Sequence, residues 1–140
     1  MTTIALAQSD DDIARCFPVM RQLRPHLVET EFVATVKKQQ AGGYVLVFLE
    51  KDGAVVALAG FRLIDNLVGG RVLYVDDLVT ADAQRSSGLG STMFDWLAAR
   101  AREERCTYLE LDCGVQRFDA HRFYLKNRMA ITAHHLAFRL

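Results

Sequence analysis

A glycine-bearing segment, Arg85-Ser86-Ser87-Gly88-Leu89-Gly90-Ser91, contains the residues best suited to hold an anion. It follows an apolar strand that ends at Leu78-Val79-Thr80, and it opens an amphipathic helix. The first N–H groups of a helix have no partner within it and lie at the positive end of its dipole. Glycines remove the side chains that would keep an anion from the backbone. The segment therefore predicts a pyrophosphate site.

Two common phosphate-binding patterns fit this segment poorly. A Walker-type loop needs a lysine next to its second glycine, and no lysine follows Gly90. A dinucleotide fingerprint would use Gly88 and Gly90 together with Glu110 or Asp112 about 20 residues further on. However, Met93 stands at the third glycine position, and little chain remains for further βαβ units. A dinucleotide-binding module would be recognised by its binding of a nicotinamide or flavin nucleotide.

Three motifs in order resemble one known family. Arg85 to Gly90 matches the Arg/Gln-x-x-Gly-x-Gly/Ala signature of the GNAT acyltransferase superfamily. A strand, Thr107 to Asp112, comes one helix later. Ala120 to Lys126 then looks like the Ala-x-x-Phe/Leu-Tyr-x-Lys helix of that family. The resemblance covers roughly Leu73 to Met129, and it implies an N-acetyltransferase that uses acetyl-CoA as its acyl donor.

The resemblance also implies roles for particular residues. The arm of coenzyme A would lie between splayed strands four and five and bond the main chain of Leu78 and Thr80, while Arg85 and the loop amides hold its pyrophosphate. Tyr124 occupies the position of the family's catalytic tyrosine, which gives a proton to the departing thiolate. The residues implied for the cofactor are Leu78, Val79, Thr80, Arg85, Ser86, Ser87, Gly88, Leu89, Gly90 and Ser91.

Two adjacent acidic residues, Asp76 and Asp77, are candidates for the acceptor side of the site. An alkylammonium must lose its proton before it can attack a thioester, and a carboxylate can bind it or act as a base, directly or through water. Successive strand residues point to opposite faces, so we expect only one of the two to face the cleft, and we favour Asp76. The segment Tyr74 to Leu78 is similar to the Tyr-x-Glu-Asp-x segment of diamine acetyltransferases, which hints at an amine substrate. His134 is a further candidate for the acceptor pocket.

The composition of the chain argues against nucleic acid, membranes and metal ions as binding partners. Seventeen Lys and Arg balance seventeen Asp and Glu, so no overall charge favours nucleic acid or a membrane surface. The first residues lack the pattern of a signal peptide, and we expect a cytosolic protein. Cys16, Cys106 and Cys113 lack metal-ligand spacing, so we expect reduced thiols and no metal. No linker or repeat divides the 140 residues, which we expect to form a single GNAT domain.

Hydrophobic patterning predicts an α/β fold with a GNAT-like mixed, mostly antiparallel central sheet flanked by helices. A hairpin turn is expected at Asp52-Gly53, and Ser9 is expected to cap the first helix. The expected strands are 3–7, 44–50, 54–64, 71–80, 107–112 and a closing strand or pair of strands in 131–140. The expected helices are 9–22, 30–41, 88–105 and one that ends near 127.

The chain departs from the family pattern in two places that matter for the site. Arg117 stands where many members carry an asparagine that contacts the cofactor arm, and Arg128-Met129 replaces a Gly-Phe pair that would stop the last helix. The predicted function is transfer of an acetyl group to a primary amine of a small molecule or peptide by direct attack on the thioester. The alternative is a non-catalytic acyl-CoA-binding regulatory module, and a homodimer remains open.

Overall fold

The computed structural model describes residues 1–140. Contacts between Cα atoms divide the chain into two compact units, Met1–Glu110 and Leu111–Leu140. No helix of the chain is both long and apolar enough to cross a membrane.

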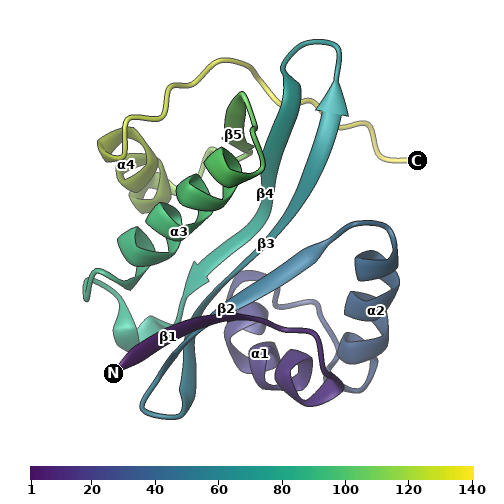
Figure 1. The fold of residues 1–140 in the computed structure, drawn as a ribbon, viewed down its shortest axis with the longest axis vertical. Helices are drawn as coiled ribbons and strands as arrows, with labels where there is room; N and C mark the ends of the chain where they lie inside the picture. The colour runs from purple at the N-terminus through teal and green to yellow at the C-terminus, as the bar shows by residue number, and fades with distance from the viewer. The chain divides into compact units, whose positions relative to one another are not determined.

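The first unit is built on a sheet whose strands follow one another in space as they do in the sequence (Figure 1). The first four strands pair in antiparallel fashion, and β5 runs parallel to β4. This confirms the predicted mixed, mostly antiparallel sheet. The strands are β1 (Thr2–Leu6), β2 (Val45–Lys51), β3 (Ala54–Asn66), β4 (Gly70–Thr80) and β5 (Tyr108–Leu111).

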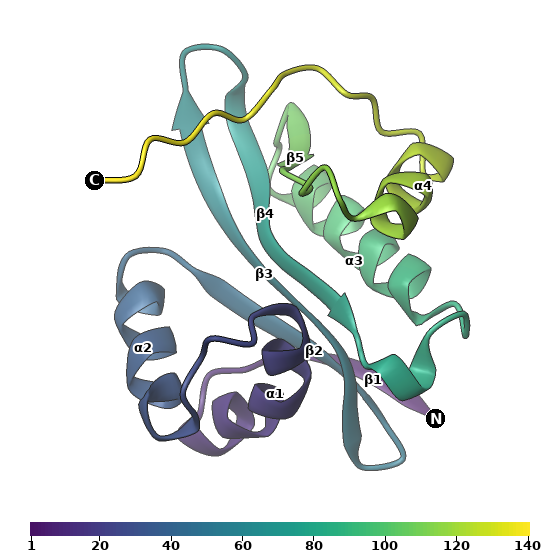
Figure 2. The same cartoon turned by 180° about the vertical axis from the view of Figure 1, so that it is seen from behind.

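Helices cover both faces of this sheet (Figures 1 and 2). On one face lie α1 (Asp10–Leu23) and α2 (Glu29–Ala41), and on the other lies α3 (Leu89–Glu103). Leu46, Phe48 and Leu58 point to the first face and join the buried core of α1 and α2. Phe61 packs on Trp96 of α3, with ring centroids 6.1 Å apart. The sheet is apolar on both faces because each face is buried by helices.

Two local signals in the sequence give the expected local structures. Asp52 and Gly53 have φ values of 52° and 82°, the two positive values that a type I′ hairpin turn requires. The Ser9 hydroxyl accepts a hydrogen bond of 3.1 Å from the Asp12 N–H and so caps α1. Both predictions are confirmed, since each depends only on neighbouring residues.

The second unit contains α4 (Phe118–Lys126). The sequence led us to expect no left-handed helix stop here, because Arg128 replaces the usual glycine, but the structure has one. Arg128 itself adopts the left-handed conformation, with φ 69°. Its N–H bonds the Leu125 carbonyl at 3.0 Å, and the Met129 N–H bonds the Tyr124 carbonyl at 3.1 Å. These two bonds form a Schellman stop. The stop survives without glycine, although the left-handed conformation is strained for arginine.

The prediction of a closing strand in 131–140 is wrong, because these residues form neither helix nor strand. Leu136 and Phe138 alternate as a strand would require, but they are 87% and 88% exposed. Alternation makes a segment suitable for a sheet, whereas a strand exists only when its backbone pairs with a partner. Sequence alone could not supply that partner.

Candidate active site

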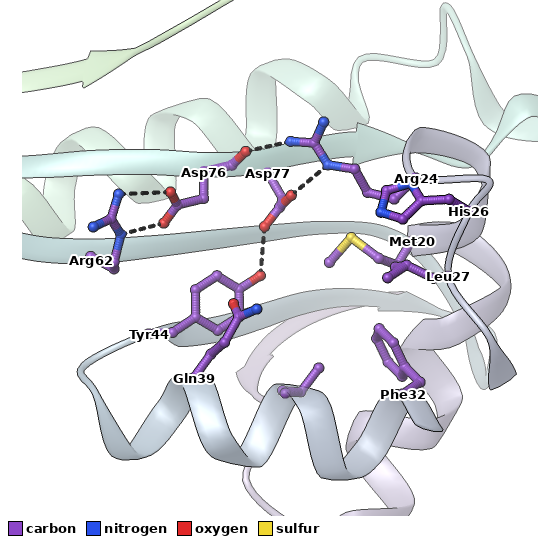
Figure 3. Close-up of a pocket in the computed structure, with 11 residues that line it drawn as sticks. Met20, Arg24, His26, Leu27, Phe32, Gln39, Tyr44, Arg62, Asp76 and Asp77 are labelled. Carbon is purple, nitrogen blue, oxygen red and sulfur yellow. Dashed lines mark hydrogen bonds and ion pairs between the residues drawn. The ribbon is translucent and has the colours of Figure 1, made fainter. Parts of the chain in front are cut away.

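The centre of β4 contains a β-bulge. Asp77 is paired with Gly60 of β3 and Val75 with Phe61, so Asp76 is the extra residue between two consecutive pairs. A bulge interrupts the strict alternation of side chains and redirects one of them. As a result Asp76 and Asp77 both face the side of the sheet that carries Tyr44 (Figure 3). The expectation that only one of them faces the cleft is therefore wrong.

Asp76 is held by Arg62 of β3. Arg62 donates from Nε and Nη2 to the two carboxylate oxygens, at 2.8 and 2.9 Å. This hydrogen bonding raises the pKa of Arg62, which keeps the guanidinium charged. The guanidinium also lies 5.3 Å from the centre of the Tyr74 ring. Both oxygens of Asp76 are thus engaged by a cation, which makes it poorly suited to accept a proton directly.

Asp77 is held from two sides. Arg24, the residue that ends α1, donates from Nε to one carboxylate oxygen at 3.0 Å, and the Tyr44 hydroxyl donates to the other at 2.8 Å. Arg24 also donates from Nη2 to the Asp76 backbone carbonyl at 2.8 Å. Burial first, and then the charge of Asp77, raises the pKa of Tyr44 well above its ordinary value. Tyr44 therefore remains a neutral donor.

Gly60 makes room for this arrangement. The Tyr44 ring lies directly over it, so that a Cβ atom added at Gly60 would meet the Tyr44 hydroxyl oxygen at 1.7 Å and Cζ at 2.3 Å. Only a residue without a side chain allows Tyr44 to reach across β3 to Asp77.

These groups form the wall of a cavity of about 600 Å³ (Figure 3). The end of α1, the loop after it, α2 and the start of β2 complete the lining. The polar or ionisable lining residues are Arg24, His26, Gln39, Tyr44, Arg62, Asp76 and Asp77, and the apolar ones are Met20, Leu27, Phe32 and Val36. Sequence reasoning missed Arg24, Arg62 and Tyr44. Only Arg62 left a signal, a charge inside an otherwise apolar strand.

The far end of β4 has an open backbone edge. The Ala81 N–H bonds the Val56 carbonyl at 2.8 Å, so by antiparallel alternation Val79 bonds β3 while Leu78 and Thr80 direct their backbone groups to the other side. On that side β5 begins near Arg71, whose carbonyl accepts from the Thr107 N–H at 2.8 Å. With four residues against the eleven of β4, β5 accompanies only the first part of that strand. The predicted arm-binding residues Leu78 and Thr80 therefore expose the edge that an extended ligand would need.

The segment after β4 leads into the N-terminus of α3. A 3₁₀ turn, Asp82–Gln84, precedes Ser86 and Gly88, which have φ values of 66° and 84°. Gly88 is the N-cap of α3, so the first N–H groups of the helix are those of Leu89, Gly90 and Ser91. Arg85 is exposed and pairs with Asp82 at 3.0 Å. The loop therefore has the exposed backbone N–H groups that an anion site would need. No cluster of His, Cys, Asp or Glu in the chain could hold a metal ion.

Comparison with known proteins identifies the family. The model of the Acetyltransferase (GNAT) family matches residues 8–128. The chain belongs to the GNAT family. The uncharacterized N-acetyltransferase YhdJ of Bacillus subtilis (strain 168) is 33% identical over 132 residues, which cover 94% of this chain and 92% of YhdJ.

Solved structures share the GNAT fold. A transcriptional regulator from Bacillus halodurans C-125 superposes with a TM-score of 0.88 at 20% identity, and the match covers 100% of both chains. AAC(6′)-Iy in complex with the bisubstrate analogue CoA-S-monomethyl-acetylneamine gives a TM-score of 0.85 at 13% identity, covering 100% of this chain and 98% of that one. At these identities the likeness shows the fold alone.

The remaining candidate residues lie in the second unit, and of these only Tyr124 comes from the GNAT resemblance. Tyr124 is in α4, and burial raises its pKa to about 12, so its hydroxyl stays protonated at neutral pH. Burial also raises the pKa of Cys113, which disfavours a reactive thiolate. His134 lies after α4 in the segment without regular structure, while its neighbour His135 contacts Asp112 at 2.9 Å. The roles of Tyr124 and His134 stay predictions.

Proposed function

We propose that this GNAT protein transfers the acetyl group of acetyl-CoA to a primary amine of a small molecule or peptide by direct attack on the thioester. The observation that carries the proposal is that one strand, β4, contributes residues to two places, which we name the cofactor half-site and the acceptor half-site. Its last residues, Leu78 and Thr80, offer an open backbone edge beside the α3 N-terminus, and its central residues, Asp76 and Asp77, line a cavity.

The cofactor half-site fits the chemistry of coenzyme A. The N–H groups from Ser86 to Ser91 would bind the pyrophosphate, and the backbone of Leu78 and Thr80 would bond the amide arm. Arg85 can turn from Asp82 to a phosphate because an exposed ion pair contributes only about 0–1 kcal/mol. Bound acetyl-CoA supplies an activated acyl group, and the protein supplies the position of the amine and the route for its proton.

The acceptor half-site must handle an ammonium. Obtaining the free amine from an ordinary alkylammonium at pH 7 costs about 4–5 kcal/mol; a carboxylate can bind and orient the ammonium, and its proton is carried through water to bulk solvent. We assign Asp76 and Asp77 to this binding role. Because Arg62 engages both oxygens of Asp76, the proton leaves through water rather than onto Asp76 directly.

Tyr124 is the proposed proton donor. Its hydroxyl oxygen holds a proton at neutral pH because burial raises its pKa to about 12. The proton would pass from this oxygen to the leaving sulfur, which departs as a thiol, and the phenolate would then regain a proton from water, which balances the one lost by the amine.

Release of free thiol from acetyl-CoA tests the proposal. We expect thiol release with the purified protein and a panel of primary amines, together with a matching N-acetyl product by mass spectrometry. Gly90→Val should abolish both the thiol release and the thermal stabilisation by coenzyme A. Stabilisation of the wild type by acetyl-CoA without turnover of any amine would instead identify a non-catalytic acyl-CoA-binding module.

The role of Asp76 has its own test. Asp76→Asn should impair turnover of amines most at neutral pH and less at higher pH, where more free amine exists. An equal loss from pH 7 to 9.5 would remove Asp76 from the handling of the proton.

A further inference from the structure

The charges that line the acceptor cavity compensate one another, and the cations are the more accessible. The side chains of Arg24 and Arg62 are 42% and 43% exposed. Those of their partners Asp77 and Asp76 are only 14% and 27% exposed. The side chains of the two cations are therefore more open to solvent than those of the two carboxylates. This arrangement works against the attraction of polycations that the acidic pair suggests in the sequence.

Both guanidinium groups retain donors for a ligand. A guanidinium has five N–H donors, and the bonds to Asp76 engage only Nε and Nη2 of Arg62. Arg24 likewise uses Nε on Asp77 and Nη2 on the Asp76 carbonyl, which leaves Nη1. The carboxylates hold both groups in place, so little side-chain freedom would be lost when an oxyanion binds.

Apart from His26 and Gln39, the side chains that complete the cavity lining are apolar. Met20, Leu27, Phe32 and Val36 come from α1, the loop after it and α2 (Figure 3). Burial of apolar surface against such a wall favours a ligand with a hydrocarbon group. The volume of about 600 Å³ suits a small molecule.

We propose that the acceptor is a zwitterionic amine, in which the primary amine is accompanied by an oxyanion a few bonds away and by an apolar side chain. Arg62 and Arg24 bind the oxyanion, Asp76 and Asp77 bind the ammonium, and the α1–α2 wall buries the hydrocarbon. This inference rests on the proposed acetyl transfer and names its substrate class. Alternating charges suit a zwitterion because each charged group of the ligand meets an opposite charge of the protein.

A matched set of amines tests the substrate class. Leucine carries the amine, the carboxylate and the apolar group; leucinamide and 3-methylbutylamine lack the anion; 1-amino-3-methylbutylphosphonate replaces the carboxylate; and spermidine is a polycation. We expect kcat/KM for leucine or for its phosphonate analogue to exceed that for 3-methylbutylamine and spermidine by about 10- to 100-fold, the worth of one charge-assisted contact. The better of the two anionic amines identifies the oxyanion.

Substitution of Arg62 completes the test. Arg62→Gln should raise KM for the anionic amine about 10- to 100-fold more than it changes KM for 3-methylbutylamine, with partial recovery in Arg62→Lys. Arg71→Gln is the matched control, since the Arg71 side chain is 41% exposed and pairs with Glu104 away from the cavity lining. It should change neither KM.

The outcomes separate this inference from the proposed function. Turnover of 3-methylbutylamine or spermidine as efficient as that of both anionic amines would overturn the zwitterion while leaving acetyl transfer intact. If no amine releases thiol, acetyl transfer is refuted for this panel of amines. The zwitterion inference is then tested by thermal shift, which measures binding of each amine. Stabilisation by the anionic amines no greater than by 3-methylbutylamine would then overturn it.

Discussion

Replacement of Gly60 by alanine should disrupt the acceptor wall through Tyr44 alone. The added Cβ would lie 1.7 Å from the Tyr44 hydroxyl oxygen and 2.6 Å from Cε1, so the buried ring must move. The backbone at Gly60 lies outside the left-handed region, so alanine itself brings no strain there. Any destabilisation therefore reports the contact between the ring and the strand.

The expected loss has two parts. Displacement of the ring breaks the 2.8 Å bond from Tyr44 to Asp77, and a hydrogen bond to a charged group contributes about 1.5–3 kcal/mol. Overpacking of a buried site costs about 1–3 kcal/mol more. We expect Gly60→Ala to lower the free energy of unfolding by about 3–5 kcal/mol, which corresponds to a Tm lowered by about 10–15 °C at this chain length.

Urea and thermal unfolding followed by circular dichroism measure this loss. Tyr44→Phe is the first control, since it removes the hydroxyl, keeps the ring, and should lose only about 1.5–3 kcal/mol. In a Tyr44→Ala background the ring is gone, and Gly60→Ala should then cost less than about 1 kcal/mol. A Gly60→Ala protein within about 2 °C of the wild type, or one equally destabilised in the Tyr44→Ala background, would refute the reasoning.

Three further predictions address the donor, a helix end and the core. Tyr124→Phe should lower kcat about 10²-fold with little change in acetyl-CoA affinity; an unchanged kcat with chemistry rate-limiting would return Tyr124 to a packing role. Arg105 ends α3 with φ 59°, so Arg105→Gly should raise the free energy of unfolding by about 1 kcal/mol in urea, whereas the control Arg102→Gly inside the helix should lower it. Burial raises the pKa of Cys16 to about 12 from 9.0, so the stabilisation that comes from keeping this thiol neutral is complete below pH 9 and is lost as pH rises toward 12. The free energy of unfolding should therefore depend on pH less steeply in Cys16→Ala across this range. Identical pH dependence in the two proteins would contradict the assignment.

The sequence predicted those parts of the molecule that depend on neighbouring residues or on a long repeating pattern. The Ser9 cap and the Asp52-Gly53 turn are local, and the amphipathic helix expected over 88–105 buries one residue per turn from Leu89 to Ala101. The loop from Arg85 was recognisable for the same reason, because its glycines and its helix stand together in the chain.

The acceptor wall could not be predicted in this way, because its parts come together only in the folded chain. Tyr44, Arg24 and Asp77 meet from three separate elements. The bulge that turns Asp76 to the same side arises from the pairing of β3 with β4, and strand periodicity contains no sign of it. The prediction of a closing strand was wrong for a related reason, because alternation of apolar residues in 131–140 does not show which strand they would pair with.

The part of β4 that follows its bulge fixes the distance between the two carboxylates and the open backbone edge. At about 3.3 Å per residue, the step from Asp77 to Thr80 sets a span of about 10 Å between the carboxylate wall and the open edge. Because both features belong to one hydrogen-bonded strand, this span cannot stretch or shrink with the movement of a loop. A deletion of Asp76 would restore strict alternation, so that a single carboxylate, that of Asp77, would remain on the side of the sheet that carries Tyr44. The regular pairing of Asp77 to Thr80 with β3 thus sets how far a group must travel between the carboxylates and the open edge.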